Sequence, residues 1–234
     1  MLNLQIRPSF GNRPFGKEFL AKNSLTDEAL DQLLRKLSVQ AEWVGLRYVS
    51  EATHWRGFRN QKPDENTVLF DRGVMVEVLV NGYFSYAGTS DLSERGIQRA
   101  FDKATSVAKV ASQNKIFGFS TLQRPKAVGS YRSPFFSYMD AMTLEELNDL
   151  LILACEKLKV SDKIVNTEAS AGLVESTMCY FTSSGTNIRQ EFLMSTSHFQ
   201  ATAQDANDTQ ARSDKGGRGR CYQVGLELFD REQI

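Results

Sequence analysis

The sequence predicts an α+β fold of two helix-then-antiparallel-sheet units, with helices packed on one face of mostly antiparallel sheets. Two observations carry this prediction. Valine occupies every second position from Val74 to Val80, which is the period of a strand that buries one face. From Ile97 to Ala111 apolar residues recur at helical spacing, which predicts a helix packed on that sheet.

The order of the elements divides the chain of 234 residues into four parts. Residues 1–23 are interpreted as a partly ordered extension and residues 24–115 as the first α+β unit. Residues 116–140 form an aromatic-rich connector, and residues 141–234 form the second α+β unit. The start of the chain carries charges and proline where a signal peptide has an apolar block, so secretion is not expected.

The first unit opens with a predicted helix at about residues 25–40. Ser24 or Thr26 can cap its amino end, and Asp27 and Glu28 suit the positive end of the helix dipole. Its buried stripe consists of leucines at helical spacing: Leu30, Leu33, Leu34 and Leu37.

Strands follow this helix. Residues 44–60 alternate in polarity and are predicted as a strand pair, and a polar turn is predicted at residues 62–66. Asn81-Gly82 tolerates the positive φ angles of a type I′ turn between the valine strand and a returning strand at residues 83–87. The next helix buries a stripe of apolar residues: Ile97, Ala100, Phe101, Ala104, Val107, Ala108 and Ala111.

The connector lacks clear periodicity, but its many aromatic residues indicate that it packs against the rest of the protein. The second unit begins at Thr143 and Glu146, which form a capping box before a stripe of Leu147, Leu150, Leu151, Ala154 and Leu158.

Strands are then predicted at residues 164–170, 173–182, 187–205 and 221–229, with a turn at residues 183–185. They are rich in threonine and serine, so we expect one sheet face to be wet or covered by another polypeptide.

Composition excludes several classes of protein. Lysine plus arginine and aspartate plus glutamate each number 28, so no global field favours nucleic acid or an anionic membrane. No apolar run approaches the roughly 20 residues of a transmembrane helix. Three cysteines without a C-x-x-C pair fit a reducing compartment, and we expect a cytoplasmic protein.

Catalytic groups are sparse. The two histidines, His54 and His198, lie far apart in sequence and outside any metal-binding motif, so we interpret them as surface or hydrogen-bonded residues and expect no metal site on this chain. We interpret Cys155 and Cys179 as small buried hydrophobic residues, and Cys221 as the most exposed thiol. No catalytic residue is predicted.

One glycine-rich loop remains a candidate binding site, formed by Lys215, Gly216, Gly217, Arg218, Gly219 and Arg220. Its glycines permit close approach of another backbone, and its cations can hold a carboxylate or phosphate. It either contacts a substrate or partner or is a solvated loop. Residues 54–59 mix aromatics with arginines, as single-stranded nucleic-acid surfaces do, but packing of Trp55 and Phe58 beneath arginine stems explains them as well.

Three segments together resemble the TldD/PmbA family, once described as modulators of DNA gyrase and now regarded as metallopeptidases. They are residues 73–111 with Ser-Asp-Leu-Ser-Glu at the helix start, residues 180–190, and residues 216–219 before Cys221-Tyr222. The similarity covers about residues 24–229 and leans slightly toward the TldD-like branch.

The resemblance implies a zinc peptidase whose metal ligands, an H-E-x-x-x-H helix and a later cysteine, lie in a carboxyl-terminal domain. No residue here matches these ligands, so zinc is implied for the full-length family and not for this chain. We therefore expect the non-catalytic amino-terminal portion of such a peptidase, as a fragment or a stand-alone version, which shapes peptide access and subunit assembly. The alternative is an adaptor that regulates a longer family member.

The resemblance also implies particular partners. These are a peptide or unfolded protein substrate and a homo- or hetero-oligomer with a family member. Nucleic-acid binding is not favoured, and it would show as DNA affinity that falls steeply with salt.

Overall fold

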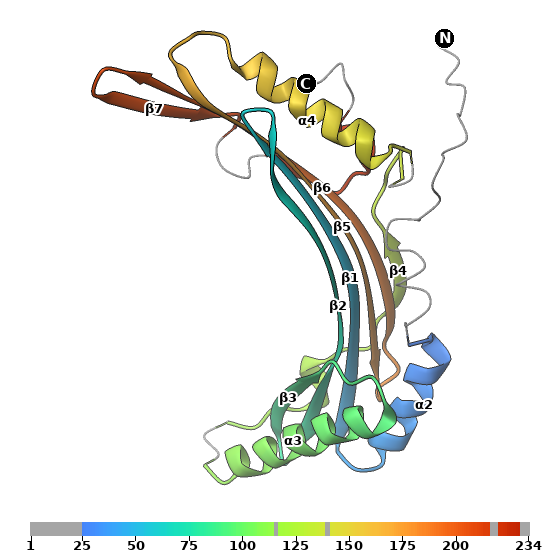
Figure 1. Cartoon of the computed structure of the whole chain (residues 1–234). Coiled ribbons are helices and arrows are strands. Elements are labelled where there is room, and N and C mark those ends of the chain that lie inside the picture. Colours follow the sequence, from blue (N-terminus) through green and yellow to red (C-terminus); the bar gives the residue numbers. More distant parts are fainter. Residues whose placement is uncertain (1–24, 115–116, 139–140, 216–219, 230–234) are drawn as a thin grey trace.

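A computed structural model describes residues 25–114, 117–138, 141–215 and 220–229 (Figure 1). The extension predicted at residues 1–23 lies outside the described residues. The helices are α2 (Asp27–Ser38), α3 (Glu94–Ser112) and α4 (Leu144–Leu158), with 3-10 turns at Thr121–Gln123 and Leu226–Phe229. The strands are β1 (Trp43–Arg59), β2 (Lys62–Val80), β3 (Tyr83–Thr89), β4 (Val128–Arg132), β5 (Ile164–Thr182), β6 (Asn187–Asp205), β7 (Asp208–Ser213) and β8 (Arg220–Tyr222).

All eight described strands belong to one sheet, in the order β3-β2-β1-β5-β6-β4, with β7 and β8 also paired to β6. Neighbouring strands are antiparallel except for the parallel pair β4 and β6. The sheet is long and curved, with α2 and α3 near one end and α4 near the other (Figure 1). The predicted α+β class is confirmed.

The strands of the two predicted units are joined because β1 pairs with β5 from Gly45 opposite Thr182 to Arg59 opposite Glu168. Each unit nevertheless has its own apolar core. Both cores lie on the same sheet face, since even-numbered residues of β1 contribute to each: Val44, Leu46 and Tyr48 to the first core and Phe58 to the second.

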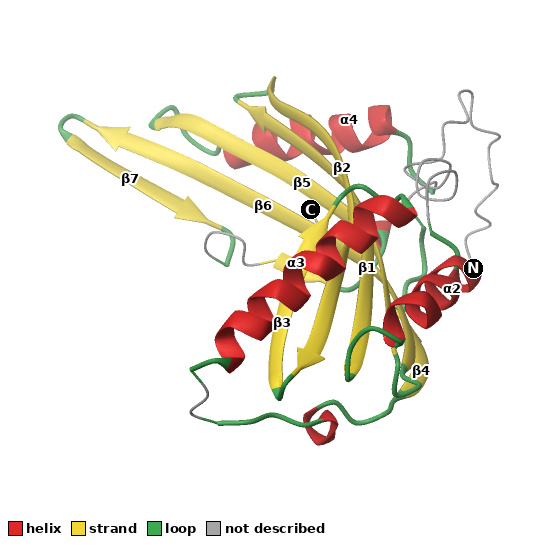
Figure 2. Cartoon of the chain, turned by 90° about the horizontal axis from the view of Figure 1, so that it is seen from below, coloured by secondary structure: helices red, strands yellow, loops and turns green. Residues whose placement is uncertain are grey.

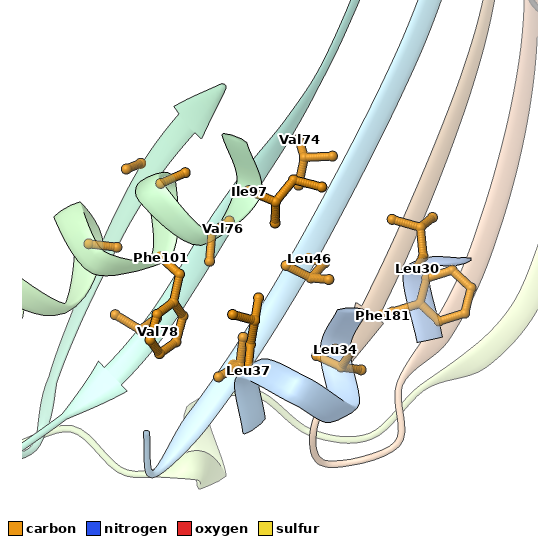
Figure 3. Close-up of a cluster of buried hydrophobic side chains, with 14 of the residues drawn as sticks. Leu30, Leu34, Leu37, Leu46, Val74, Val76, Val78, Ile97, Phe101 and Phe181 are labelled. Atoms are coloured by element: carbon orange, nitrogen blue, oxygen red, sulfur yellow. The ribbon is translucent and has the colours of Figure 1, made fainter. Parts of the chain in front are cut away.

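The first core lies between the sheet and helices α2 and α3 (Figure 3). Leu30, Leu34 and Leu37 of α2 are buried, as the leucine spacing predicts, and Leu33 is partly buried. In α3 the predicted stripe is wrong at Val107, whose side chain is 51% exposed. Val107 lies at the margin of the apolar stripe, where the helix surface turns from the sheet to solvent.

The second core lies under α4. Leu147, Leu150, Leu151 and Ala154 of this helix are buried, and Leu158 is partly buried. Facing them are strand residues and the 3-10 turn near the carboxyl end: Phe58, Ala169, Ala171, Leu173, Leu193, Phe199, Leu226 and Phe229.

The helix starts follow the predicted capping chemistry. In α2 the Thr26 hydroxyl accepts a hydrogen bond from Ala29 N, at 3.2 Å. In α4 the Thr143 hydroxyl accepts from Glu146 N, while the Glu146 carboxylate accepts from Thr143 N. Both helices therefore begin where the sequence places them.

Several strand boundaries differ from the prediction. Residues 43–59 form one strand and not a pair, and the polar turn predicted at residues 62–66 is the start of β2. The chain reverses instead at Asn60 and Gln61, with φ angles of 49° and 64°. Asparagine tolerates positive φ but glutamine is uncommon there, so Asn60-Gln61 is a weaker turn signal than Asn81-Gly82.

The second unit shows two similar differences. Residues 164–182 are one continuous strand, where two strands were predicted. The closing strand predicted at residues 221–229 ends at Tyr222, and residues 226–229 form a 3-10 turn instead.

The connector crosses the sheet face opposite the helices, at the end near α3, before it forms β4 (Figure 2). Phe119 N donates to Gly82 O at 2.7 Å, and the Phe119 ring contacts the rings of Phe84 and Tyr83. The connector thus packs on the sheet through its aromatic residues. Among the described helices, none is long and apolar enough to cross a membrane.

Candidate functional site: a polar cleft between the two cores

The helix-bearing face of the sheet carries a cleft of about 720 Å³ between the two apolar cores. Its floor comes from β1, β5 and β6. The amino end of α2 forms one wall, and Arg132 at the end of β4, with Phe135 and Tyr138 after it, forms another. Its volume falls within the roughly 300–1,000 Å³ of typical ligand sites.

The strand register arranges the floor in three rows. Tyr48, Cys179 and Arg189 lie side by side in the first row. Ser50, Thr177 and Glu191 form the second, and Glu175 and Leu193 form the third. At about 3.4 Å per residue the rows span about 14 Å along the strands, so the cleft is elongated.

An ion-pair network lines the first two rows. The Arg189 guanidinium lies 3.2 Å from the Asp27 carboxylate and 3.1 Å from the Glu191 carboxylate. Arg132 Nε donates to Glu191 at 2.7 Å. Partial burial acts to raise the pKa of Glu191, but the hydrogen bonds from Arg132 and Arg189 outweigh it and lower this pKa. Glu191 is therefore an anion that fixes both arginines.

The wall formed by α2 adds two carboxylates, Asp27 and Glu28. Hydrogen bonds to the backbone at the helix start lower the pKa of Glu28. Next to Asp27 is the Cys179 thiol, which is buried and donates to Asp27 at 3.7 Å. Burial is the main cause that raises the pKa of Cys179 to about 11, so this thiol stays protonated at neutral pH and is no nucleophile.

The opposite end of the cleft holds Tyr138 and a carboxylate, whereas a second tyrosine, Tyr48, lies in the first row of the floor. The Tyr138 hydroxyl donates to Glu175. The Tyr48 side chain is 1% exposed, and its hydroxyl has no hydrogen-bond partner among the described residues although it lines the cleft. A buried hydroxyl without a partner costs free energy, so a bound ligand that bonds to it would be favoured.

The glycine-rich loop predicted as a binding site lies elsewhere. Gly216, Gly217, Arg218 and Gly219 lie outside the described residues. Lys215 is exposed at the end of a turn, with φ of 53°, and Arg220 forms an ion pair with Asp214. Neither Lys215 nor Arg220 lines the cleft.

The histidines occupy ordinary positions. His54 is buried on the helix-bearing face and its ring contacts Phe70 edge-on, with centroids 6.2 Å apart. Burial, aided by the charge of Arg56, lowers the pKa of His54. His198 lies on β6, far along the chain from His54. Within the described residues, no group of three or more His, Cys, Asp and Glu side chains is placed to hold a metal ion.

The other predicted side chains follow strand alternation. Cys155 is buried against Phe58 O, and Cys221 is exposed, both as predicted. Trp55 and Phe58 lie on opposite sheet faces, so residues 54–59 do not form one aromatic surface. Arg56 is buried, and its guanidinium donates to Trp55 O at 2.8 Å.

Sequence reasoning missed the residues that line the cleft. Arg189 and Glu191 are two residues apart on a strand and so share a face, a pattern that could have indicated a charged surface. Their partner Arg132 lies more than fifty residues away, and it meets Glu191 only because β4 pairs with β6.

Comparison with solved structures shows the class of fold. A proposed modulator of DNA gyrase from Bacteroides thetaiotaomicron has a TM-score of 0.64 and 12% identity, over 81% of this chain and 45% of that chain. TldE from Thermococcus kodakarensis has a TM-score of 0.56 and 10% identity, over 79% of this chain and 42% of that chain. A second proposed gyrase modulator, from Thermotoga maritima, has a TM-score of 0.58 and 15% identity, over 87% of this chain and 47% of that chain.

The family follows from the sequence match. Residues 44–108 match PmbA/TldA metallopeptidase domain 1. This part of the chain is therefore a first domain of the PmbA/TldD type, and the predicted resemblance to the TldD/PmbA amino-terminal region is confirmed. The chain spans less than half the length of each of the three solved structures. No curated protein matches the sequence.

Proposed function

We propose that this chain is the non-catalytic amino-terminal portion of a TldD/PmbA-type zinc metallopeptidase, which shapes peptide access and contributes to subunit assembly. The observation that carries the proposal is the match of residues 44–108 to the first domain of that family, together with the fold likeness over most of the chain. The metal ligands are expected in a separate H-E-x-x-x-H domain.

The chemistry of the described residues supports a binding role. The cleft holds arginines that are already paired with carboxylates, and a buried thiol whose raised pKa keeps it protonated at neutral pH. Zinc in the family's other domain would polarise the scissile carbonyl. The role proposed for this chain is to hold and orient a peptide.

An open strand edge supports peptide binding and assembly. The outer edge of β6 already carries β4, β8 and β7. On the other side, β3 pairs with β2 only from Val74 onward, so residues 62–73 of β2 have no outer neighbour among the described strands. Such an edge offers backbone groups to an extended peptide or to a second subunit.

The loop from Lys215 to Arg220 is proposed to face the substrate or a partner. Its exposed lysine and its glycines suit contact with a carboxylate or with another backbone. We propose a cytoplasmic location and a homo- or hetero-oligomer with a family member.

The test is a reconstitution. The purified chain is incubated with zinc and an unfolded peptide, alone and with a longer TldD/PmbA family member. The expected result is no cleavage by the chain alone, co-purification with the longer protein, and a change in its KM for the peptide. Chelator-sensitive hydrolysis by this chain alone would overturn the proposal.

The same experiment distinguishes the proposed role from the alternative, an adaptor that regulates a longer family member. If the longer protein already has a complete peptide path and the added chain only raises or lowers its kcat, the adaptor role is favoured. A gel-shift titration at low salt checks the remaining class, since DNA binding would appear there and weaken steeply as salt is added.

A further inference from the structure

We propose that the cleft between the two cores binds an extended peptide segment through a basic side chain, lysine or arginine. This rests on the proposed role in peptide access and names the class of peptide. The cleft's charge, an unpartnered buried hydroxyl and the elongated shape each support it.

The charge of the residues that line the cleft favours binding of a cationic side chain. Among the residues that the structure describes, the lining includes four carboxylates, Asp27, Glu28, Glu175 and Glu191, and two cations, Arg132 and Arg189. Both arginines are held by carboxylates of the same cleft: Arg189 by Asp27 and Glu191, and Arg132 by Glu191. The lining thus carries two more negative than positive groups, and its arginines are not available to bind an anion.

The Tyr48 hydroxyl is the second observation. It belongs to a side chain that is 1% exposed, and no described residue hydrogen-bonds to it. A hydroxyl oxygen can accept from a lysine ammonium or an arginine guanidinium. Tyr48 therefore supplies a polar anchor at the floor of the cleft, beside the carboxylates of α2.

The shape favours an extended segment. The second floor row carries the small side chains Ser50 and Thr177, while the aromatic rings of Phe135 and Tyr138 stand at one end. Small floor residues leave room for a backbone, and aromatic walls pack against the aliphatic stem of lysine or arginine. Glu175, held by Tyr138, lies in the third row, and Tyr48 in the first.

The experiment measures binding of short fluorescein-labelled peptides to the full chain. One peptide contains lysines, and two others carry glutamate or methionine at the same places. We expect the lysine peptide to bind, with an affinity that falls as salt is added, and the glutamate peptide to bind at least about tenfold more weakly. Equal binding of all three peptides would overturn the proposal.

Two isosteric variants locate the site. Glu175→Gln should lower the affinity for the lysine peptide by about tenfold, as expected when one charge-assisted hydrogen bond is lost. Tyr48→Phe should lower the affinity for the lysine peptide by a few-fold, since this substitution removes one hydrogen bond from a neutral hydroxyl. The matched control is Glu51→Gln, because Glu51 lies on β1 between Ser50 and Ala52 and points to the opposite sheet face.

The control variants and melts show whether a loss of binding comes from the cleft or from a change in the fold. If Glu51→Gln weakens binding as much as Glu175→Gln, or if neither variant has an effect, the cleft is not the site. Thermal melts of each variant show whether the fold is retained. The reconstitution above gives an independent result: a chain that changes the partner's KM for the peptide but binds all three labelled peptides equally keeps the proposed function and loses this inference.

Discussion

Arg124 of the connector pairs with Glu77 of β2 on the sheet face opposite the helices. The Arg124 Nη2 and Glu77 Oε1 atoms lie 2.5 Å apart, and the Tyr180 hydroxyl donates to the other Glu77 oxygen at 3.1 Å. The Arg124 guanidinium also lies over the Phe84 ring, 4.6 Å from its centroid. These contacts fasten the connector to β2, β3 and β5, of which β5 is distant in sequence from the other two.

Arg124→Ala should lower the free energy of unfolding by about 1–3 kcal/mol. The substitution leaves the mostly buried Glu77 carboxylate without its cation, and the partial exposure of Arg124 limits the loss. Urea denaturation measures the effect. The control is Arg35→Ala, which removes an exposed i,i+4 pair with Asp31 and should cost at most about 0.5 kcal/mol. Equal losses in the two variants would contradict a fastening role for Arg124.

Gly172→Ala should destabilise the sheet centre. Gly172 lies opposite Trp55, and a Cβ there would meet the Trp55 ring at 2.1 Å. Such overpacking costs typically about 1–3 kcal/mol. Gly129→Ala is the matched control, because a Cβ at Gly129 meets nothing within 4 Å, and it should be neutral or slightly stabilising. A thermal melt of Gly172→Ala that matches the melt of Gly129→Ala would show that Trp55 moves aside freely.

The two cores should unfold together. Leu30→Ala in the first core and Leu151→Ala in the second each remove a fully buried side chain, at a cost of about 2–5 kcal/mol. Because β1 and β5 run through both units, we expect one denaturation transition that both variants shift. Leu153→Ala, on the exposed side of α4, should shift it little. Two transitions, each sensitive to one variant, would instead establish two separate folding domains.

The protein should lose stability at alkaline pH. Burial is the main cause that raises the pKa of Cys179 from 9.0 to about 11 and that of Tyr180 from 10.0 to about 12. The folded state therefore holds these protons where the unfolded state has released them, so the free energy of unfolding falls as pH rises above about 9. Below pH 9 these two groups contribute no pH dependence.

Urea denaturation across the range from pH 9 to 11 measures this slope. Cys179→Ala should give a shallower slope than the unsubstituted chain, with the remainder coming from Tyr180. Identical slopes would mean that Cys179 ionises in the folded state as readily as in the unfolded state.

Local chemistry predicted much of the fold. The helix starts at Thr26 and Thr143 follow from capping, which involves neighbours in sequence. Asn81 and Gly82 adopt φ angles of 52° and 76°, as their residue types predict. The turn at Asn60 and Gln61 was missed because glutamine carries no such preference, so the strands on either side of it were misplaced.

The cleft could not be predicted in the same way. Arg132, Arg189 and Asp27 meet only when β4 joins β6 and α2 packs on the first core. No pattern within one strand shows that Glu191 will face Arg132.

The sequence by itself determined the α+β class, the helix starts, the hairpin at Asn81-Gly82 and the family of residues 44–108. Each of these depends on residues close together in the chain, whose backbone preferences act locally. Only the tertiary structure decided that the two units share one sheet, that the connector is fastened by Arg124, and that a negatively charged cleft lies between the cores. Those features depend on contacts between segments far apart in the chain, such as the pairing of β1 with β5, which is selected by the total burial of the folded chain.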